Sequence, residues 1–285
     1  MQINFVREVT AYKNALDAII DPIRKYLPES TVTPKSGVKG DLNFCLFIRS
    51  QAPAPRVLMS HGVADKNYIK KDNADRFDWL FVPGPAYKDK HVKMGTDPSK
   101  VFVVGWPKLD PIFQGFITRS ESDKLRVLYA PTHNAIKVVS SFPAFKKCLD
   151  KFPPEIEVIS SPHPARKEDR MPTLQALVDT DVVISDSGSM IYEAWALGKP
   201  VIFPDWLVRD GVLNRFKGSF EAQIYEQNIG YHAKDFKHLL QLVDVALHKG
   251  VDEHVKEFMQ EICPAQFNGK SGKTIAYALK DLAGQ

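Results

Sequence analysis

DVVISDSGSMIYEAWALGKPVIFPDW, residues 181–206, is the segment that best indicates how the chain folds. An apolar strand ends at Ser185, a turn of small polar residues follows, and a helix begins at about Met190. The tripeptide GKP ends the helix, and PVIFPD forms a second buried strand. A strand, a helix and another apolar strand in succession predict a parallel sheet covered by helices.

The turn inside this segment is suited to holding a phosphate. Ser187, Gly188 and Ser189 are small, so backbone N–H groups at the helix start can approach an anion closely, and the helix dipole favours negative charge there. Glu193, about one helical turn further on, is a candidate acceptor for hydrogen bonds from sugar hydroxyls. A simpler interpretation is that Asp186 and Ser189 only cap the helix. The neighbouring motifs favour the phosphate interpretation.

Strand and helix patterns alternate along both halves of the chain. From Asp41 the short β-rich runs are NFCLFIRS, RVLMS, WLFVPG and KVFVVGWP, with a helix expected at Pro85 to Met94. The second series runs from RVLYAPT through EVISSPHP and DVVIS to closing helices near His238 to His248 and Lys273 to Leu282. Alternating strands and helices imply parallel sheets with helices on both faces.

Two α/β domains account best for this pattern. We predict Rossmann-like domains at residues 1–115 and 116–285, each with a parallel sheet, and a ligand-binding cleft between them. Before the first β-rich run, Val6 to Tyr26 has near-helical apolar spacing, with Pro22 as a break or kink, and is expected to form one or two core-facing helices.

The composition excludes several classes of protein. With 285 residues, 44% hydrophobic and 25% charged, the chain is expected to be globular rather than disordered or fibrous. Its apolar runs fall far short of the ~20 residues of a membrane span, and no signal peptide is evident, so a cytoplasmic location is expected. Cys45, Cys148 and Cys263 lack metal-ligand spacing, so packed thiols are predicted rather than a structural zinc site. A net charge of +4 suits anionic ligands, acidic lipid headgroups included, but does not argue for nucleic acid.

Histidines follow predicted strands in both halves. His61 follows a strand in VLMSHG, and His163 follows another in VISSPHP. LYAPTHN ends a third strand with Thr132 and His133. Ligand-binding residues of open α/β sheets gather at the carboxyl ends of strands, so these side chains are candidates for one site. Taken singly, each histidine also fits a structural role.

Two cations follow the histidine motifs. Lys66 lies five residues beyond His61, and Arg166 lies three residues beyond His163. Both offer positive charge to a diphosphate, although solvated surface charge is the commoner role of such residues. FNGKSGKT, residues 267–274, is similar to a Walker A loop, but Phe267 occupies the first required glycine position and no strand precedes it. It is therefore interpreted as the turn that begins the last helix.

Taken together, these segments resemble the CDP-glycerol glycerophosphotransferase family, which comprises teichoic-acid and capsule polymerase enzymes of the cell envelope with a GT-B fold. The resemblance runs from about Val57 to Leu282. Its ordered motifs are HGVADK at 61, GWPKLD at 105, LYAPTHN at 128, SPHP at 161, ISDSGSMIYEAWALGKPVIFPD at 184 and FNGKSGKT at 267. It implies that His61 and His163 are the essential catalytic pair, and that the turn 187–189 binds the donor phosphate.

This chain departs from the family pattern in the turn. The family usually has Asp-Tyr-Ser-Ser there and an aspartate on the helix, whereas this chain has Asp186-Ser187-Gly188-Ser189 and Glu193. The DSGS turn followed by a glutamate is similar to UDP-N-acetylglucosamine 2-epimerases and to sugar transferases of the same architecture.

The resemblance implies a reaction. CDP-glycerol, or a related CDP-alditol, would bind with its diphosphate at the turn and His163 and its ribose near Glu193. A hydroxyl of a polyol-phosphate, glycan or lipid-linked acceptor, deprotonated by His61, would attack the β-phosphorus and expel CMP. A neutral imidazole suits a general base at cytoplasmic pH. No metal or other cofactor is expected, and the basic charge allows peripheral contact with the inner face of the membrane.

Two alternatives belong to this interpretation. The first is a GT-B glycosyltransferase or a 2-epimerase that uses a UDP-sugar. The second is a non-catalytic module that binds carbohydrate or lipid and has kept the fold. Fold alone does not decide among these functions.

Overall fold

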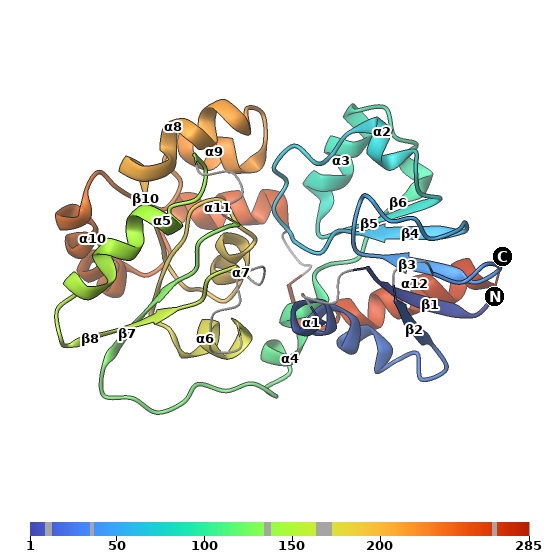
Figure 1. The fold of residues 1–285 in the computed structure, drawn as a ribbon, viewed down its shortest axis with the longest axis horizontal. Coiled ribbons are helices and arrows are strands. Elements are labelled where there is room, and N and C mark those ends of the chain that lie inside the picture. Colours follow the sequence, from blue (N-terminus) through green and yellow to red (C-terminus); the bar gives the residue numbers. More distant parts are fainter. Residues whose placement is uncertain (9–12, 35–36, 134–137, 164–172, 264–266, 285) are drawn as a thin grey trace. The chain divides into compact units, whose positions relative to one another are not determined.

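The computed structural model describes residues 1–285 except 9–12, 35–36, 134–137, 164–172, 264–266 and 285. The chain forms two compact units, each built on a parallel sheet with helices around it (Figure 1). Unit 1 comprises Met1–Val63, Tyr68–Phe116 and Gln260–Gln285. Unit 2 comprises Ala64–Asn67 and Ile117–Met259.

Unit 1 contains a six-stranded sheet in the order β2-β1-β3-β4-β5-β6. Every neighbouring pair in it is parallel. The strands are β1 (Ile3–Arg7), β2 (Thr31–Pro34), β3 (Leu42–Cys45), β4 (Arg56–Met59), β5 (Trp79–Val82) and β6 (Val101–Val103). The inner strands bury nearly continuous apolar runs, as expected for a parallel sheet covered on both faces.

The helices of unit 1 are α1 (Lys13–Arg24), α2 (Lys71–Ala74), α3 (Pro85–Lys93), α4 (Asp110–Phe113) and α12 (Ser271–Ala283), with short 3-10 turns at Pro98–Lys100 and Pro107–Leu109. The last helix, α12, packs on α1, β1 and β3. Its close approach to α1 requires glycine, because a Cβ at Gly272 would lie 2.5 Å from the carbonyl oxygen of Pro22. The last helix is therefore part of the unit 1 core.

The start of α12 is capped from a distant part of the chain. The Asp110 carboxylate accepts hydrogen bonds from the N–H groups of Ser271, at 3.2 Å, and Gly272, at 2.7 Å. A carboxylate at a helix start satisfies orphan N–H groups and interacts favourably with the helix dipole. This confirms the prediction that FNGKSGKT begins the last helix.

Unit 2 contains a five-stranded sheet in the order β11-β10-β9-β7-β8. All of its neighbouring pairs are parallel. The strands are β7 (Leu125–Tyr129), β8 (Ile156–Ser160), β9 (Val182–Ile184), β10 (Val201–Pro204) and β11 (Tyr231–Ala233). The predicted series RVLYAPT, EVISSPHP, DVVIS and PVIFPD corresponds to β7 through β10.

The helices of unit 2 are α5 (Phe142–Phe145), α6 (Thr173–Asp179), α7 (Met190–Ala196), α8 (Asp205–Arg215), α9 (Phe220–Glu226), α10 (Phe236–Lys249) and most of α11 (Glu253–Ile262), with a 3-10 segment at Lys146–Lys151. The long helix α10 packs on β9, β10 and β11. Val182, Ile202, Leu239 and Val243 contribute to this apolar core. None of the helices in the described residues is long and apolar enough to cross a membrane.

Two expectations for secondary structure and domains need correction. Val6 was predicted to be helical but lies in β1, because a short apolar run does not distinguish a buried strand from a helix. The predicted second domain, 116–285, differs from unit 2, because the apolar face of α12 packs in unit 1 and Ala64–Asn67 pack in unit 2. The sequence patterns did not predict β2, α8, α9, β11 or α11.

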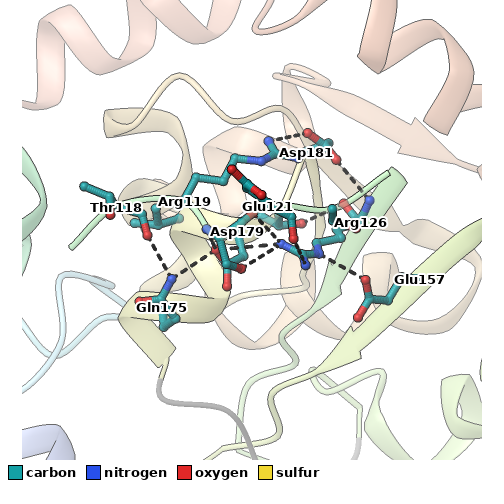
Figure 2. A network of polar contacts seen from close by, with 12 residues as sticks. Thr118, Arg119, Glu121, Arg126, Glu157, Gln175, Asp179 and Asp181 are labelled. Atoms are coloured by element: carbon teal, nitrogen blue, oxygen red, sulfur yellow. Dashed lines mark hydrogen bonds and ion pairs between the residues drawn. The ribbon is translucent and has the colours of Figure 1, made fainter. Parts of the chain in front are cut away.

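A network of charged groups lies where β7 and β9 begin (Figure 2). It holds the segment that follows Ile117, the start of the long stretch of unit 2. Asp181 accepts hydrogen bonds from the guanidinium of Arg119, at 2.6 Å, and from the N–H of Arg126, at 3.0 Å. Asp179 accepts from the N–H of Ser120 at 2.7 Å, and Arg126 pairs with Glu157 at 3.0 Å. The segment that enters unit 2 is thereby attached to its sheet.

We predict that Asp181→Asn lowers the free energy of unfolding by about 1–3 kcal/mol at pH 7, because two donors lose a charged acceptor. Burial alone would raise the pKa of Asp181, but the bonds from Arg119 and the Arg126 N–H outweigh it and lower the pKa. The stabilisation is therefore present above the unfolded pKa, about 3.9, and is lost as the pH falls through the lower folded value.

Urea denaturation of wild type and Asp181→Asn from pH 7 to pH 3 measures this difference. The exposed Asp123 provides a control, Asp123→Asn, for which little change is expected. An equal loss in the control, or a difference that grows as the pH falls, contradicts the assignment.

Candidate functional site

The carboxyl ends of β7, β8 and β9 lie side by side, because β7 pairs with both other strands. β8 follows β7 in the chain and lies on one side of it, while β9 lies on the other. The order of strands therefore reverses at β7 and β9, and open α/β sheets bind ligands outside the carboxyl ends of strands at such a point. The candidates Thr132, His133, His163 and Ser187–Ser189 all follow these three strands.

His133 follows β7 and His163 follows the neighbouring strand β8, and their rings are in contact. Their ring centroids are 4.8 Å apart and their planes are nearly perpendicular, at 89°. Both side chains are half-buried. Imidazole nitrogens donate hydrogen bonds and carry positive charge when protonated, so this pair is suited to an anionic ligand.

The carboxylate of Asp186 faces into the protein. It is fully buried and accepts hydrogen bonds from the N–H groups of Thr132 (2.7 Å), Ser187 (2.7 Å) and Ser141 (2.9 Å) and from the Ser141 hydroxyl (2.9 Å). Burial raises the pKa of Asp186, while these N–H donors and Lys66 oppose the rise. Asp186 thus joins the turn after β9 to the loop after β7, and its bonds are made within the protein.

Lys66 lies next to the predicted phosphate turn. Its ammonium donates a hydrogen bond to Thr132 Oγ1 at 2.6 Å. The N–H of Ala64 donates to Ser189 Oγ at 3.3 Å, which attaches the same segment to the turn. Burial lowers the pKa of Lys66, and the charges of Glu221 and Asp186 oppose the change. The predicted cation therefore lies beside Thr132, and the segment that carries it is bonded to Ser189.

Glu221 holds the backbone of the segment that carries Lys66. This fully buried carboxylate accepts hydrogen bonds from the N–H groups of Asp65 (3.0 Å) and Lys66 (2.7 Å) and from the Tyr192 hydroxyl (2.6 Å). Burial and the charge of Asp65 raise the pKa of Glu221, while the bonds from Tyr192 and Lys66 oppose the rise. Lys66 and Asn67 have left-handed backbones, with φ values of 42° and 59°.

The three residues of the predicted phosphate turn differ in how far they are buried. The Ser187 side chain is fully buried and donates to the carbonyl of Val139 at 3.2 Å. Gly188 and Ser189 are half-buried. A Cβ at Gly188 would lie 3.7 Å from both Cβ and Oγ1 of Thr132, so the glycine faces the residue that Lys66 contacts. Of the three, Gly188 and Ser189 present accessible surface.

Two residues predicted to contact the ligand, Glu193 and Arg166, are not seen among the accessible groups of the site. Glu193 is fully buried in α7, so its carboxylate is not accessible to a sugar in this conformation. The sequence favours a surface position for a helical glutamate, and only the packing of α7 buries it. Arg166 lies outside the described residues.

His61 lies in unit 1, after β4. Its backbone N–H donates to the carbonyl of Leu46 at 2.9 Å, and its Nδ1 lies 3.2 Å from the same oxygen. Phe47 stacks on the ring, with centroids 4.4 Å apart. Because a carbonyl oxygen can only accept, this contact favours the ring with a proton on Nδ1. In that tautomer the nitrogen of the exposed ring that can take a proton is Nε2.

Sequence reasoning missed the buried carboxylates around these groups. Asp186 was considered only as a helix cap in the alternative interpretation of the turn, and Glu221 lies in a stretch with no assigned element. Ser219 was a usable signal, since its hydroxyl accepts from the N–H of Ala222 at 3.1 Å and begins the helix that carries Glu221.

Within the described residues, no group of three or more His, Cys, Asp or Glu side chains is arranged to hold a metal ion.

No protein-family model and no curated protein sequence matches this chain. Solved structures do match it. The wall teichoic acid polymerase TagF is 13% identical with a TM-score of 0.66, over 99% of this chain and 89% of that one. The fold is GT-B.

Epimerases of known structure match the GT-B fold of this chain as well. A putative UDP-N-acetylglucosamine 2-epimerase from Listeria monocytogenes is 14% identical with a TM-score of 0.58, over 99% of this chain and 96% of that one. The UDP-GlcNAc 2-epimerase from Neisseria meningitidis, bound to UDP-GlcNAc, is 13% identical with a TM-score of 0.57, over 99% and 100%. The two parallel sheets with their helices confirm the predicted fold class.

We predict that Asp186→Asn lowers the free energy of unfolding by about 3 kcal/mol, since an amide cannot accept from all four donors and leaves buried N–H groups unpaired. Urea denaturation monitored by circular dichroism measures the loss. The exposed Asp210 provides the control, Asp210→Asn, which should stay within about 0.5 kcal/mol of wild type. Equal stability of the two variants argues against the anchoring role of Asp186.

Proposed function

We propose that this protein transfers glycerol phosphate, or a related alditol phosphate, from a CDP-linked donor to an acceptor hydroxyl and releases CMP. The observation that carries the proposal is the gathering of Lys66, Thr132, His133, His163 and Gly188 where β7, β8 and β9 end. A cation, two imidazoles and an accessible glycine backbone together suit a diphosphate.

The donor diphosphate is assigned to unit 2. His163 and His133 donate hydrogen bonds to its oxygens, the turn at Gly188 and Ser189 receives it, and Lys66 and Arg166 offset its charge. Phosphoryl transfer depends chiefly on positioning and on electrostatic stabilisation, which are the contributions these groups can make. Glu193 keeps its assignment to the ribose only if α7 adjusts on binding.

His61 is the general base of the proposed reaction. Its Nε2 takes the proton of the acceptor hydroxyl as the oxygen forms a bond to the β-phosphorus. The bond between that phosphorus and the bridging oxygen breaks, and CMP leaves with the electron pair. The contact between Nδ1 and Leu46 supports this role, because it keeps Nε2 as the acceptor. Acceptors with a free hydroxyl, such as polyol-phosphates, glycans or lipid-linked carriers, fit the step.

We predict that His61→Ala lowers kcat by roughly 10²–10⁴-fold, as expected for loss of a general base. His163→Ala should raise KM for the donor by about tenfold or more, as expected for loss of a hydrogen bond to a charged ligand. The assay measures CMP release from CDP-glycerol with a glycerol-phosphate primer.

The exposed His248 provides the control, His248→Ala, which should retain full turnover. Unchanged turnover in both the His61 and the His163 variants would remove the proposed mechanism.

A UDP-sugar transferase or 2-epimerase is the second candidate function. It is favoured by the likeness to an epimerase structure that contains UDP-GlcNAc, and by the glutamate that follows the DSGS turn. A thermal-shift screen over CMP, CDP, UDP and GDP separates the candidates, since a ligand that binds only the folded state raises its apparent stability. Stabilisation by CDP and CMP supports the first candidate, and stabilisation by UDP alone supports the second.

We predict that Gly188→Val retains the fold but weakens nucleotide binding at least tenfold. The added Cβ meets Thr132 at an ordinary contact distance of 3.7 Å, so the position has room for it, and circular dichroism of the free variant checks that the fold is retained. Its methyl groups would occupy the space assigned to the diphosphate. Titration calorimetry with the stabilising nucleotide measures the affinity, with Gly188→Ala as the smaller change. Wild-type affinity in the valine variant places the phosphate elsewhere.

A further inference from the structure

We propose that Glu221 is a positioning residue for the donor-phosphate site. Through the backbone of Ala64–Asn67, it holds the ammonium of Lys66 beside Thr132. The nature of the ligand rests on the proposed function, whereas the placement of Lys66 by Glu221 does not.

Glu221 holds the backbone at Asp65 and Lys66 through hydrogen bonds, and these bonds are called the clamp below. One carboxylate oxygen accepts from the Asp65 N–H at 3.0 Å and the other from the Lys66 N–H at 2.7 Å. The Tyr192 hydroxyl donates to the first oxygen at 2.6 Å. Two successive N–H groups on one buried carboxylate fix the orientation of the peptide between them, and the tyrosine fixes the carboxylate.

The clamped backbone is strained. Lys66 has a φ of 42° and Asn67 a φ of 59°, in the left-handed region that side chains other than glycine seldom adopt. Such a conformation persists where surrounding bonds hold it. Asn67 also donates to the carbonyl of Lys217 at 3.0 Å, and Asp65 accepts from the Phe220 N–H at 3.1 Å. The turn is thus held by Glu221, by the first residue of its helix, Phe220, and by Lys217 before that helix.

The clamp determines where the Lys66 charge lies. The left-handed backbone directs the side chain to Thr132, whose Oγ1 is 2.6 Å from Nζ and would be 3.7 Å from a Cβ at Gly188. The charge is therefore placed beside the accessible part of the turn.

The direction of the change in nucleotide affinity distinguishes a positioning role of Glu221 from a simple effect of its charge. Glu221 is an anion near the assigned phosphate site, so removal of its charge would by itself tighten binding of an anionic nucleotide. Removal of the clamp would instead weaken binding, because Lys66 is released. A Glu221→Gln variant keeps the size of the side chain and tests both at once.

The experiment measures CDP affinity by titration calorimetry for wild type, Glu221→Gln, Lys66→Met and the double variant. We expect about tenfold weaker binding in each single variant, and no further loss in the double variant beyond that of Lys66→Met. Glu226→Gln, an exposed change on the same helix, is the matched control and should bind as wild type does. Tyr192→Phe removes one bond to the clamp and should weaken binding to a smaller extent if Glu221→Gln folds poorly.

Limited acetylation followed by mass spectrometry tests the placement without any nucleotide. Lys66 should react at least several-fold faster in Glu221→Gln than in wild type, while the exposed Lys249, at the end of α10, reacts equally in both. Unchanged Lys66 reactivity, or tighter CDP binding by Glu221→Gln, overturns the inference. If wild type binds none of the four nucleotides while Lys66 reactivity rises in the variant, the proposed transfer fails and the positioning role stands.

Discussion

The buried carboxylate of Asp186 is the constraint on which the candidate site depends. It is removed from water and compensated by donors from Thr132, Ser141 and Ser187. A buried carboxylate is tolerated only with such compensation, so the loop after β7 and the turn after β9 are held together by the same group. Tyr225 reinforces the arrangement, since its hydroxyl donates to the carbonyl of Asp186 at 2.7 Å.

A second buried carboxylate, Glu221, repeats the principle with a different segment. It compensates its own burial with backbone N–H groups of a short stretch that also carries a lysine. In both cases the acidic group binds the protein backbone, and the groups proposed to meet the ligand are the two imidazoles, Ser189 and the Lys66 ammonium. The site is thus basic and polar at its surface although acidic groups support it from within.

The local parts of this arrangement follow from sequence, and the long-range parts do not. Residues 181–206 predict β9, α7 and β10 closely, because apolar runs and small turn residues act over a few positions. The parallel sheets also follow from alternation of patterns. The contact of Lys66 with Thr132, the burial of Glu193 and the return of α12 to unit 1 depend on packing between distant segments. No spacing in the chain predicts them.

We propose that a nucleotide diphosphate binds where β7, β8 and β9 end in unit 2. Backbone amide chemical shifts of ¹⁵N-labelled protein during titration with CDP and with UDP test it most directly. We expect the largest changes on the amides of Thr132, His133, Gly188 and Ser189, and little change on those of Arg126 and Asp181, at the opposite ends of β7 and β9. Changes centred away from the ends of these strands, or none with either nucleotide, would contradict it.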